Sequence, residues 1–272
     1  MNRRWTAFTA ADVQYLADHT PVEQYSTAPL QKGEYMPAFT SRLNGRTVTI
    51  TFDDGQALTY AFRDTHRLTW TGSDGLTHEE YCQIVEAPGD DRVLFVQHYC
   101  AGSAPPTAHT LILDFGTGLA TVCIASIGVP ESAREVSRTF RFGLMDGYPD
   151  PGYRHGFTRD LVGKAILWTY NEQEGYRIKH IYSSPLYYTY MMWNAEAGTR
   201  WVASNPADYI KINDDLYVFS FVEERQAGTQ GLFLINLRTL HDVGSFFGVH
   251  IHGIECYVFG AKGEYVSRPD LN

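Results

Sequence analysis

The sequence predicts an all-β protein built from two antiparallel β-barrels in tandem. Three observations lead to this prediction: a composition rich in aromatic residues and glycine, short alternating runs separated by turn residues, and a repeat of the whole pattern. Of the 272 residues, 14% are aromatic, and the chain contains 18 Tyr, 24 Gly and 12 Pro. Strands favour aromatic residues, whereas tight turns favour glycine and proline. The composition is therefore typical of many short strands joined by tight turns.

The repeat is visible when the two halves of the chain are aligned. The first copy begins LNGRTVTITF and the second begins LVGKAILWTY. Gly45 then matches Gly163, and Phe52 matches Tyr170 at the same offset of 118 residues. Further along, DD before VLFV corresponds to DD before LYVF, and LILDFGTG corresponds to LFLINLRT. Agreement in this order indicates an internal duplication.

The segments outside the repeat complete the predicted division of the chain. Thr9 can cap a helix that runs to Asp18, with Val13 and Leu16 on one apolar face. Prolines then break the chain into a loop that we expect to wrap the first domain. The predicted parts are residues 1–42 for the helix and wrapping loop, 43–129 for the first barrel, 130–160 for a linker with a short helix at Glu131–Val136, and 161–272 for the second barrel.

Each copy contains seven or eight short strands with turn sequences such as DDG, SDG, PGDD and NDD between them, and almost no helical period. Sequential antiparallel strands without crossover helices favour an up-and-down barrel that closes on itself. The expected fold is therefore a pair of lipocalin-like, or calycin-like, barrels.

Charge and hydropathy exclude several classes of partner. The formal net charge of −9 argues against nucleic acid, which needs a basic surface. The sequence also lacks the basic amphipathic segments or long apolar runs that a membrane role requires. The N-terminal residues have no apolar core of a secretory signal, so we expect a cytoplasmic protein. A small molecule is the expected partner, and a homodimer is compatible with the sequence.

The four cysteines have neither disulfide-type nor metal-type spacing, and they are Cys82, Cys100, Cys123 and Cys256. In a reducing compartment we expect four free, mostly buried thiols. Cys82 and Cys100 could lie on neighbouring strands.

The stretch from Leu161 to Glu223 holds the candidate site. Side chains two apart on a strand share a face, so Trp168 and Tyr170 point the same way, and Glu223 closes the row that begins YVFSF. Burying an unpaired carboxylate costs on the order of several kcal/mol. Glu223 therefore lies at the barrel mouth or meets Arg200 and Tyr170 inside, and the second arrangement would be a binding or catalytic site.

The second copy resembles the bacterial phenolic acid decarboxylases, which are lipocalin-fold enzymes that remove CO2 from hydroxycinnamic acids without a cofactor. The resemblance rests on VGK at Val162–Lys164, Thr169–Glu172, Arg200–Val202, Tyr217, Ser220, Glu223, His241 and Cys256-Tyr257. The resemblance implies that Glu223 is the catalytic carboxylate and Arg200 the family arginine. It also places Trp168 and Tyr170 at a pair of family tyrosines, so one hydroxyl is replaced by an indole. The tandem arrangement with its LNG…DDG opening resembles the MoaF family, whose label refers to molybdenum cofactor biosynthesis.

We expect a cofactor-independent lyase or isomerase that acts on a small aromatic or unsaturated carboxylic acid. Glu223 would transfer the proton, Arg200 and Tyr170 would orient the acid, and an aromatic pocket would raise the pKa of the glutamate. The residues expected to bind substrate are Trp168, Tyr188, Tyr190, Phe221 and His241. The alternative is a small-molecule binding protein with a lipocalin-like pocket and no turnover.

Two further sites stay open at this point. The first copy has Ile50 and Phe52 in place of Trp168 and Tyr170, so we expect it to be non-catalytic. An independent site there would draw on His66, His78, Glu80 and His98. In the second copy, His250 and His252 share a strand face near Glu255, yet no third metal ligand follows from the spacing. No metal is therefore expected.

Overall fold

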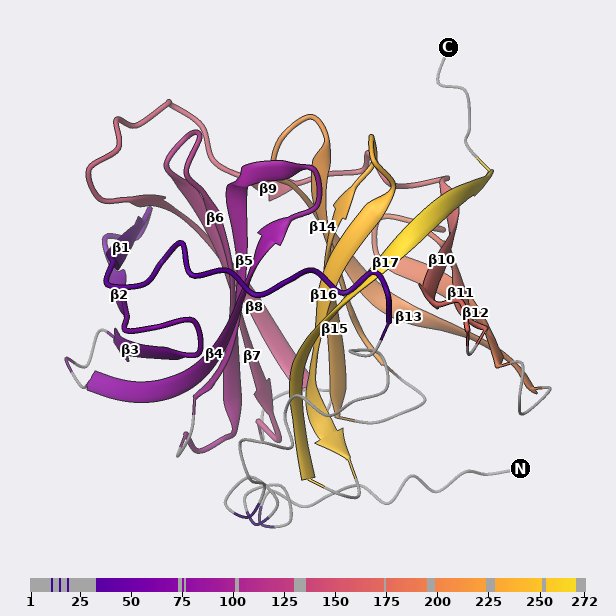
Figure 1. The fold of residues 1–272 in the computed structure, drawn as a ribbon, viewed down its shortest axis with the longest axis horizontal. Helices are drawn as coiled ribbons and strands as arrows, with labels where there is room; N and C mark the ends of the chain where they lie inside the picture. The colour runs from indigo at the N-terminus through magenta and orange to yellow at the C-terminus, as the bar shows by residue number, and fades with distance from the viewer. Residues whose placement is uncertain are drawn as a thin grey trace.

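The computed structural model describes residues 11, 15, 19, 33–72, 75, 77–100, 103–129, 136–173, 175–194, 199–223, 228–250 and 253–267. Within these residues the chain is all-β apart from its N-terminal segment, and it forms two closed antiparallel barrels that lie side by side (Figure 1). This confirms the predicted fold class. No helix in the described part is both long and apolar enough to cross a bilayer.

The first barrel consists of eight strands in sequential order. They are β1 (Thr47–Phe52), β2 (Ala57–Phe62), β3 (Arg67–Thr71), β4 (Thr77–Ala87), β5 (Asp90–Cys100), β6 (Thr107–Asp114), β7 (Leu119–Ile127) and β8 (Val136–Met145). Each strand pairs with the next, and β1 closes the barrel by pairing with β8, with Ile50 opposite Met145. The up-and-down order follows from the short turns, which leave no room for crossover connections.

The second barrel repeats this arrangement after the short strand β9 (Gly156–Phe157). Its strands are β10 (Ala165–Asn171), β11 (Tyr176–Ile181), β12 (Tyr187–Asn194), β13 (Thr199–Lys211), β14 (Leu216–Val222), β15 (Thr229–Asn236), β16 (His241–His250) and β17 (Gly253–Ser267). Pairing of β10 with β17 closes it, as pairing of β1 with β8 closes the first barrel. The duplication therefore extends strand by strand, from β1 and β10 to β8 and β17.

The first barrel extends beyond the predicted boundary at residue 129. Strand β8 lies within the segment that the sequence suggested as a linker, residues 130–160, and it supplies one wall of the barrel. The Gly and Pro residues that follow β8 are typical of a linker, and β8 itself alternates only weakly in burial, so its sequence gives a weak strand signal. Of the short helix predicted at Glu131–Val136, Val136 begins β8 and the other positions lie outside the described residues.

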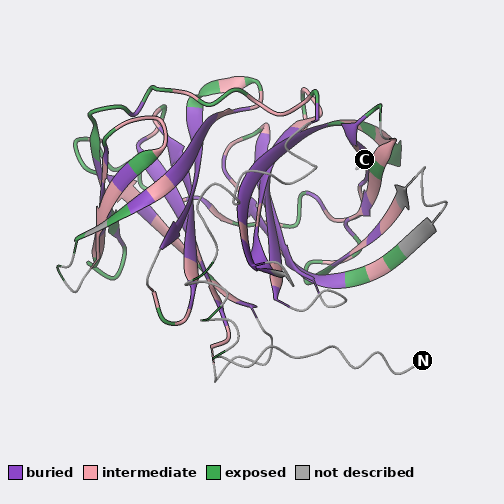
Figure 2. Ribbon diagram, turned by 60° about the horizontal axis from the view of Figure 1, so that its bottom comes forward, coloured by how far each residue is buried: buried purple, intermediate pink, exposed green. Residues whose placement is uncertain are grey.

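The two barrels pack through matching faces. Buried, mostly aliphatic side chains from β4–β7 of the first barrel meet those from β13–β17 of the second in one cluster, which includes Val93, Phe95, Val218 and Leu234. Figure 2 shows strands between the barrels that are buried along most of their length, as β14 is at every residue. Corresponding surfaces therefore face each other, as they do in a two-fold dimer.

Polar contacts cross the same junction. The Gln97 amide lies 3.3 Å from Cys256 Sγ, and the Gln230 amide lies 3.3 Å from Cys123 Sγ. All four cysteines are free and buried, as predicted. Cys82 and Cys100 lie on the neighbouring strands β4 and β5.

The N-terminal segment contacts both barrels rather than the first alone. The Tyr35 hydroxyl donates to Glu172 of the second barrel at 2.5 Å, and Phe39 forms a β-bridge with Val85 of the first. The indigo trace in Figure 1 follows this crossing. Of the predicted helix Thr9–Asp18, only residues 11 and 15 are described, and both are helical.

Candidate functional site

The interior of the second barrel is lined by aromatic rings. Strand alternation places every second residue inside, and the row Tyr217, Phe219, Phe221 and Glu223 faces inward and is buried, as the sequence predicted. Trp168 and Tyr170 join the same cluster, with 0% and 1% of their surfaces exposed. Glycines on three neighbouring strands make room for these rings. They are Gly231 on β15, Gly244 on β16 and Gly263 on β17. A Cβ at Gly244 would lie 2.7 Å from the Phe259 ring.

Glu223 ends its aromatic row beside an amide. Asn205 on β13 donates from Nδ2 to Glu223 Oε2 at 3.0 Å, and both side chains are buried. Tyr188 lies next to them: burial raises the pKa of its hydroxyl well above the ordinary value, and the charge of Glu223 raises it further. Glu223 is thus held inside the barrel by an amide, and a phenol lies beside it.

A second carboxyl group lies in the same interior, at Asp242. Its position on β16 shares a face with Gly244 and Phe246, and only 2% of the residue is exposed. Neither carboxyl oxygen has a side-chain hydrogen-bond partner among the described residues, and the Tyr170 hydroxyl has no partner among them. Tyr182 lies nearby, and its hydroxyl accepts a hydrogen bond from Trp168 Nε1 at 3.3 Å. Asp242 therefore belongs to a polar group with Tyr170, Tyr182 and Trp168.

Burial sets the protonation state of this group. It raises the pKa of Asp242 well above the usual range of a carboxyl group, and the nearby Ala261 amide offsets only part of that effect. Burial likewise raises the pKa of Tyr170 and Tyr182, and proximity to Asp242 adds to the shift in both. A protonated carboxyl group is a hydrogen-bond donor and a reservoir for one proton.

His180 adds an imidazole to the aromatic interior. The ring makes edge contacts with Tyr182, Tyr188, Phe219 and Phe233 at centroid distances of 5.4 to 6.1 Å. Burial lowers the pKa of His180 to about 3, so the imidazole is neutral. Its Nδ1 has no hydrogen-bond partner among the described residues.

Family comparisons divide the chain in the same way as the fold. The sequence model of the MoaF N-terminal domain matches residues 18–129, and that of the MoaF C-terminal domain matches residues 155–268. The chain belongs to the MoaF family. Each of the two MoaF domains falls on one barrel, which agrees with the duplication. A search of curated proteins found no match.

The MoaF fold brings some of the predicted site residues together. Tyr188 stacks on Tyr190 with ring centroids 5.9 Å apart, and it contacts Phe221 at 4.9 Å. These three line the part of the interior next to Glu223. Tyr170 contacts Tyr176 and Phe259 and neighbours Asp242. The predicted residues therefore fall into a group around Glu223 and a group around Asp242.

Two predicted residues lie differently. His241 Nδ1 shares a hydrogen bond with the Thr239 carbonyl at 2.9 Å, and its ring packs edge-on against Tyr35, on the opposite face of β16 from Asp242. The backbone of Arg200 pairs with Trp193 on β12, and its side chain lies outside the described part of the chain.

The residues that sequence reasoning missed are Asp242, Tyr182, His180 and Asn205. Asp242 follows the turn before β16, where an aspartate is normally taken as a turn residue. The signal that could have found it is alternation, since Asp242, Gly244 and Phe246 are spaced two apart. His180 on β11 and Tyr182, which directly follows that strand, show the same spacing of two.

The other two predicted sites, in the first barrel and at His250 and His252, lie partly outside the residues that the structure describes. These residues exclude His252 and the side chains of His78 and His250. In the first barrel, His66 is half-buried just before β3, and its ring stacks on Tyr81 with centroids 5.4 Å apart. Glu80 and His98 are buried.

Proposed function

We propose that the second barrel is a cofactor-independent lyase or isomerase that moves a proton on a small aromatic or unsaturated carboxylic acid. The observation that carries the proposal is Asp242, an enclosed carboxyl group whose oxygens have no side-chain hydrogen-bond partner among the described residues and whose polar neighbour is the Ala261 backbone amide. Burying such a group costs about 1–3 kcal/mol in protein variants. Buried groups whose pKa is strongly shifted occur preferentially at functional sites.

Recognition of the acid would fall to the hydroxyl donors. The Tyr170 hydroxyl and the protonated Asp242 can each donate to a substrate carboxylate. The resemblance to the decarboxylases adds Arg200 as a bidentate partner for the carboxylate. Rings such as Phe219, Phe233 and Phe259 offer faces and edges to an aromatic substrate.

Proton transfer would use the two carboxyl groups of the interior. The raised pKa of Asp242 favours its protonated form, and Asp242 is the proposed general acid. In a decarboxylation, the proton adds to the alkene carbon that bears the carboxylate. The bond to the carboxylate carbon then breaks, and its electron pair restores the alkene as CO2 leaves. Glu223, oriented by Asn205, is the proposed second carboxyl group that accepts or relays the proton.

The four buried free thiols support the proposal of a reducing, cytoplasmic location.

The competing function is binding of a small acid without turnover. The Tyr170 hydroxyl and His180 Nδ1 have no partner among the described residues, and they would satisfy a polar ligand equally well in a carrier. A binding protein would be stabilised by its ligand and would return the ligand unchanged.

The test is incubation with hydroxycinnamic acids and other small unsaturated acids, followed by ultraviolet absorbance and mass spectrometry. Loss of one CO2 or a shifted double bond is expected for the wild type. Asp242→Asn should reduce turnover by about 10²- to 10⁴-fold, the usual contribution of general acid–base catalysis, and Glu223→Gln should also reduce it. The control is Asp214→Asn, whose side chain is 100% exposed. Full activity in Asp242→Asn would contradict the assignment of Asp242, and a ligand that stabilises the protein but stays intact would favour the carrier.

A further inference from the structure

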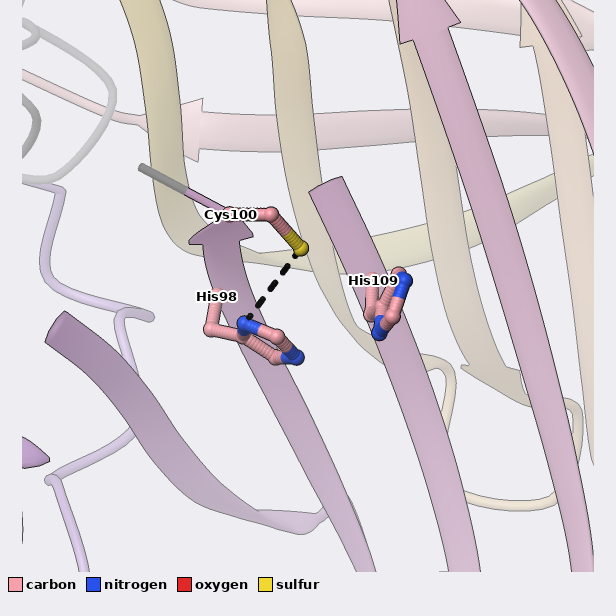
Figure 3. A group of neighbouring side chains, drawn as sticks. All are labelled: His98, Cys100 and His109. Atoms are coloured by element: carbon pink, nitrogen blue, oxygen red, sulfur yellow. Dashed lines mark hydrogen bonds between the residues drawn. The ribbon is translucent and has the colours of Figure 1, made fainter. Parts of the chain in front are cut away.

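Three side chains with metal-binding atoms converge inside the first barrel. His98 and Cys100 project from β5, and His109 projects from the neighbouring strand β6 (Figure 3). One ligand atom from each residue lies within 4.8 Å of the other two. The strand register explains the convergence, because His98 and Cys100 are two apart on one face and His98 lies directly opposite His109.

The cluster lies on the inner wall of the barrel. Leu94 and Val96, which share the face of His98 on β5, belong to the core of the first barrel. His98, Cys100 and His109 are 1%, 2% and 4% exposed. Three polar groups at this depth need partners, since buried polar groups are nearly always hydrogen-bonded or bound to metal.

The existing hydrogen bonds leave one ring nitrogen of the cluster without a partner among the described residues. His98 Nε2 has no hydrogen-bond partner among the described residues. Its Nδ1 lies 4.0 Å from Cys100 Sγ, which is at most a weak contact. His109 Nδ1 shares a hydrogen bond with the Tyr60 hydroxyl at 3.1 Å. A hydrogen bond to one ring nitrogen is the usual way in which a metal-binding histidine is oriented.

Protonation favours metal binding at the two imidazoles. Burial lowers the pKa of His98 well below its ordinary value and that of His109 to about 4. Both rings are therefore neutral near pH 7, which is the form that binds metals.

We propose that His98, Cys100 and His109 bind a divalent transition metal of the zinc class inside the first barrel. Two imidazoles and one thiolate are a ligand set that Zn²⁺ favours, with Zn–N distances of about 2.0–2.1 Å and a Zn–S distance of about 2.3 Å. The ligand atoms now lie within 4.8 Å of one another, so they must move closer together for one Zn²⁺ to bond all three. The site does not depend on the function proposed for the second barrel.

Glu80 is a candidate for a fourth position. It lies on β4 at 4% exposure, and its charge contributes to the raised pKa of Cys100 after the larger effect of burial. With Glu80 as a ligand the site would be closed and would hold β4, β5 and β6 together, as structural zinc sites do. With water in its place the site would have an open position, as catalytic zinc sites do.

The first experiment is metal titration of the full chain after treatment with a chelator. Zn²⁺ is expected to bind with a stoichiometry of one and to raise the melting temperature. Co²⁺ in place of Zn²⁺ is expected to show a sulfur-to-cobalt charge-transfer band in the near ultraviolet. Cys100→Ser should abolish that band. The matched control is Cys82→Ser, another buried cysteine of the same barrel, which should retain it.

Two further measurements keep the proposal open to refutation if Cys100→Ser does not fold. Tyr60→Phe removes only the hydrogen bond to His109 and should weaken Zn²⁺ binding by about 10- to 100-fold, as loss of an outer-shell partner typically does. X-ray absorption of the zinc-loaded wild type should show one sulfur and at least two nitrogen neighbours. A folded wild type without a cobalt–sulfur band, or a zinc shell without sulfur, would overturn the proposal.

Discussion

The two barrels have the same strand order, but different types of side chain line their interiors. In the first barrel the inner wall is mostly aliphatic, with a small cluster of histidines and Cys100 at one end of β5. In the second barrel the inner wall is mostly aromatic and encloses two carboxyl groups, Glu223 and Asp242. Ala120, the second residue of β7, occupies the inward place that Asp242 holds as the second residue of β16. The duplication therefore preserved the strands and the junction, while the inward residues diverged.

Positions on the inner wall of a duplicated barrel change more freely than positions on its packed outer face. Outward residues of β4–β7 and β13–β17 pack against each other across the junction, and they are mostly aliphatic in both copies. Inward residues contact only their own barrel, so each interior can acquire its own chemistry. Ile50 and Phe52 in the first barrel, against Trp168 and Tyr170 in the second, illustrate this freedom.

The largest effect on stability is expected from filling the space above an inward glycine. Gly244→Val should destabilise the protein by about 3 kcal/mol, because the new side chain would overlap the rings of Phe259 and Phe233. The matched control is Gly156→Val, where an added Cβ meets nothing within 4 Å. Urea denaturation measures both variants. Equal stability of the two would show that the aromatic interior of the second barrel is loosely packed.

A pH-dependent difference is expected from His180. Its folded-state pKa of about 3 lies below the ordinary value of 6.5, so the unfolded chain binds a proton that the folded chain does not. Stability from this group is present above pH 6.5 and is lost progressively as the pH falls toward 3. Between pH 7.5 and pH 5 the loss is about 2 kcal/mol.

The measurement is the free energy of unfolding of the wild type and of His180→Phe at both pH values. The wild type should lose about 2 kcal/mol more than the variant on acidification. Equal losses would mean that His180 takes up a proton without unfolding, which would conflict with a dry aromatic interior.

Asp242 should reveal a conflict between stability and function. Its folded-state pKa is raised, so its contribution is favourable at acidic pH and is lost as the pH rises through the folded-state value. Asp242→Leu removes a buried carboxyl group that has no side-chain hydrogen-bond partner among the described residues, and it should stabilise the protein by about 1–3 kcal/mol at pH 7. Thermal denaturation with activity measured in parallel is the test. A destabilised variant would indicate that Asp242 has a structural partner in solution.

The smallest effect concerns the junction rather than either interior. Arg138 of β8 pairs with Asp208 of β13, with guanidinium nitrogens 2.5 and 2.7 Å from one carboxylate oxygen. Arg138→Met should cost about 1 kcal/mol, because the pair is only partly buried and the methionine retains much of the packing. A single unfolding transition should persist in calorimetry, since the aliphatic junction is untouched. Two separate transitions would show that this ion pair couples the barrels.

Much of the site could be predicted from local pattern. Alternation along β10 and β14 was enough to place Trp168, Tyr170, Phe221 and Glu223 inside the second barrel. Local pattern could not show which polar groups lie together. Strands β10 and β16 are separated by β17, so their side chains come together only inside the closed barrel. Glu223 therefore bonds to Asn205, and Tyr170 neighbours Asp242. His98 was a candidate from sequence, but its register against His109 was not.

Strand periodicity, the duplication and the free state of the cysteines follow from residue type and spacing along the chain. The closure of the first barrel by β8, the position of Asp242 beside Tyr170, and the convergence of His98, Cys100 and His109 follow from the three-dimensional fold. Barrel closure explains this division. Which residues meet across an interior depends on the hydrogen-bond register and stagger of all eight strands, and no single stretch of sequence carries that information.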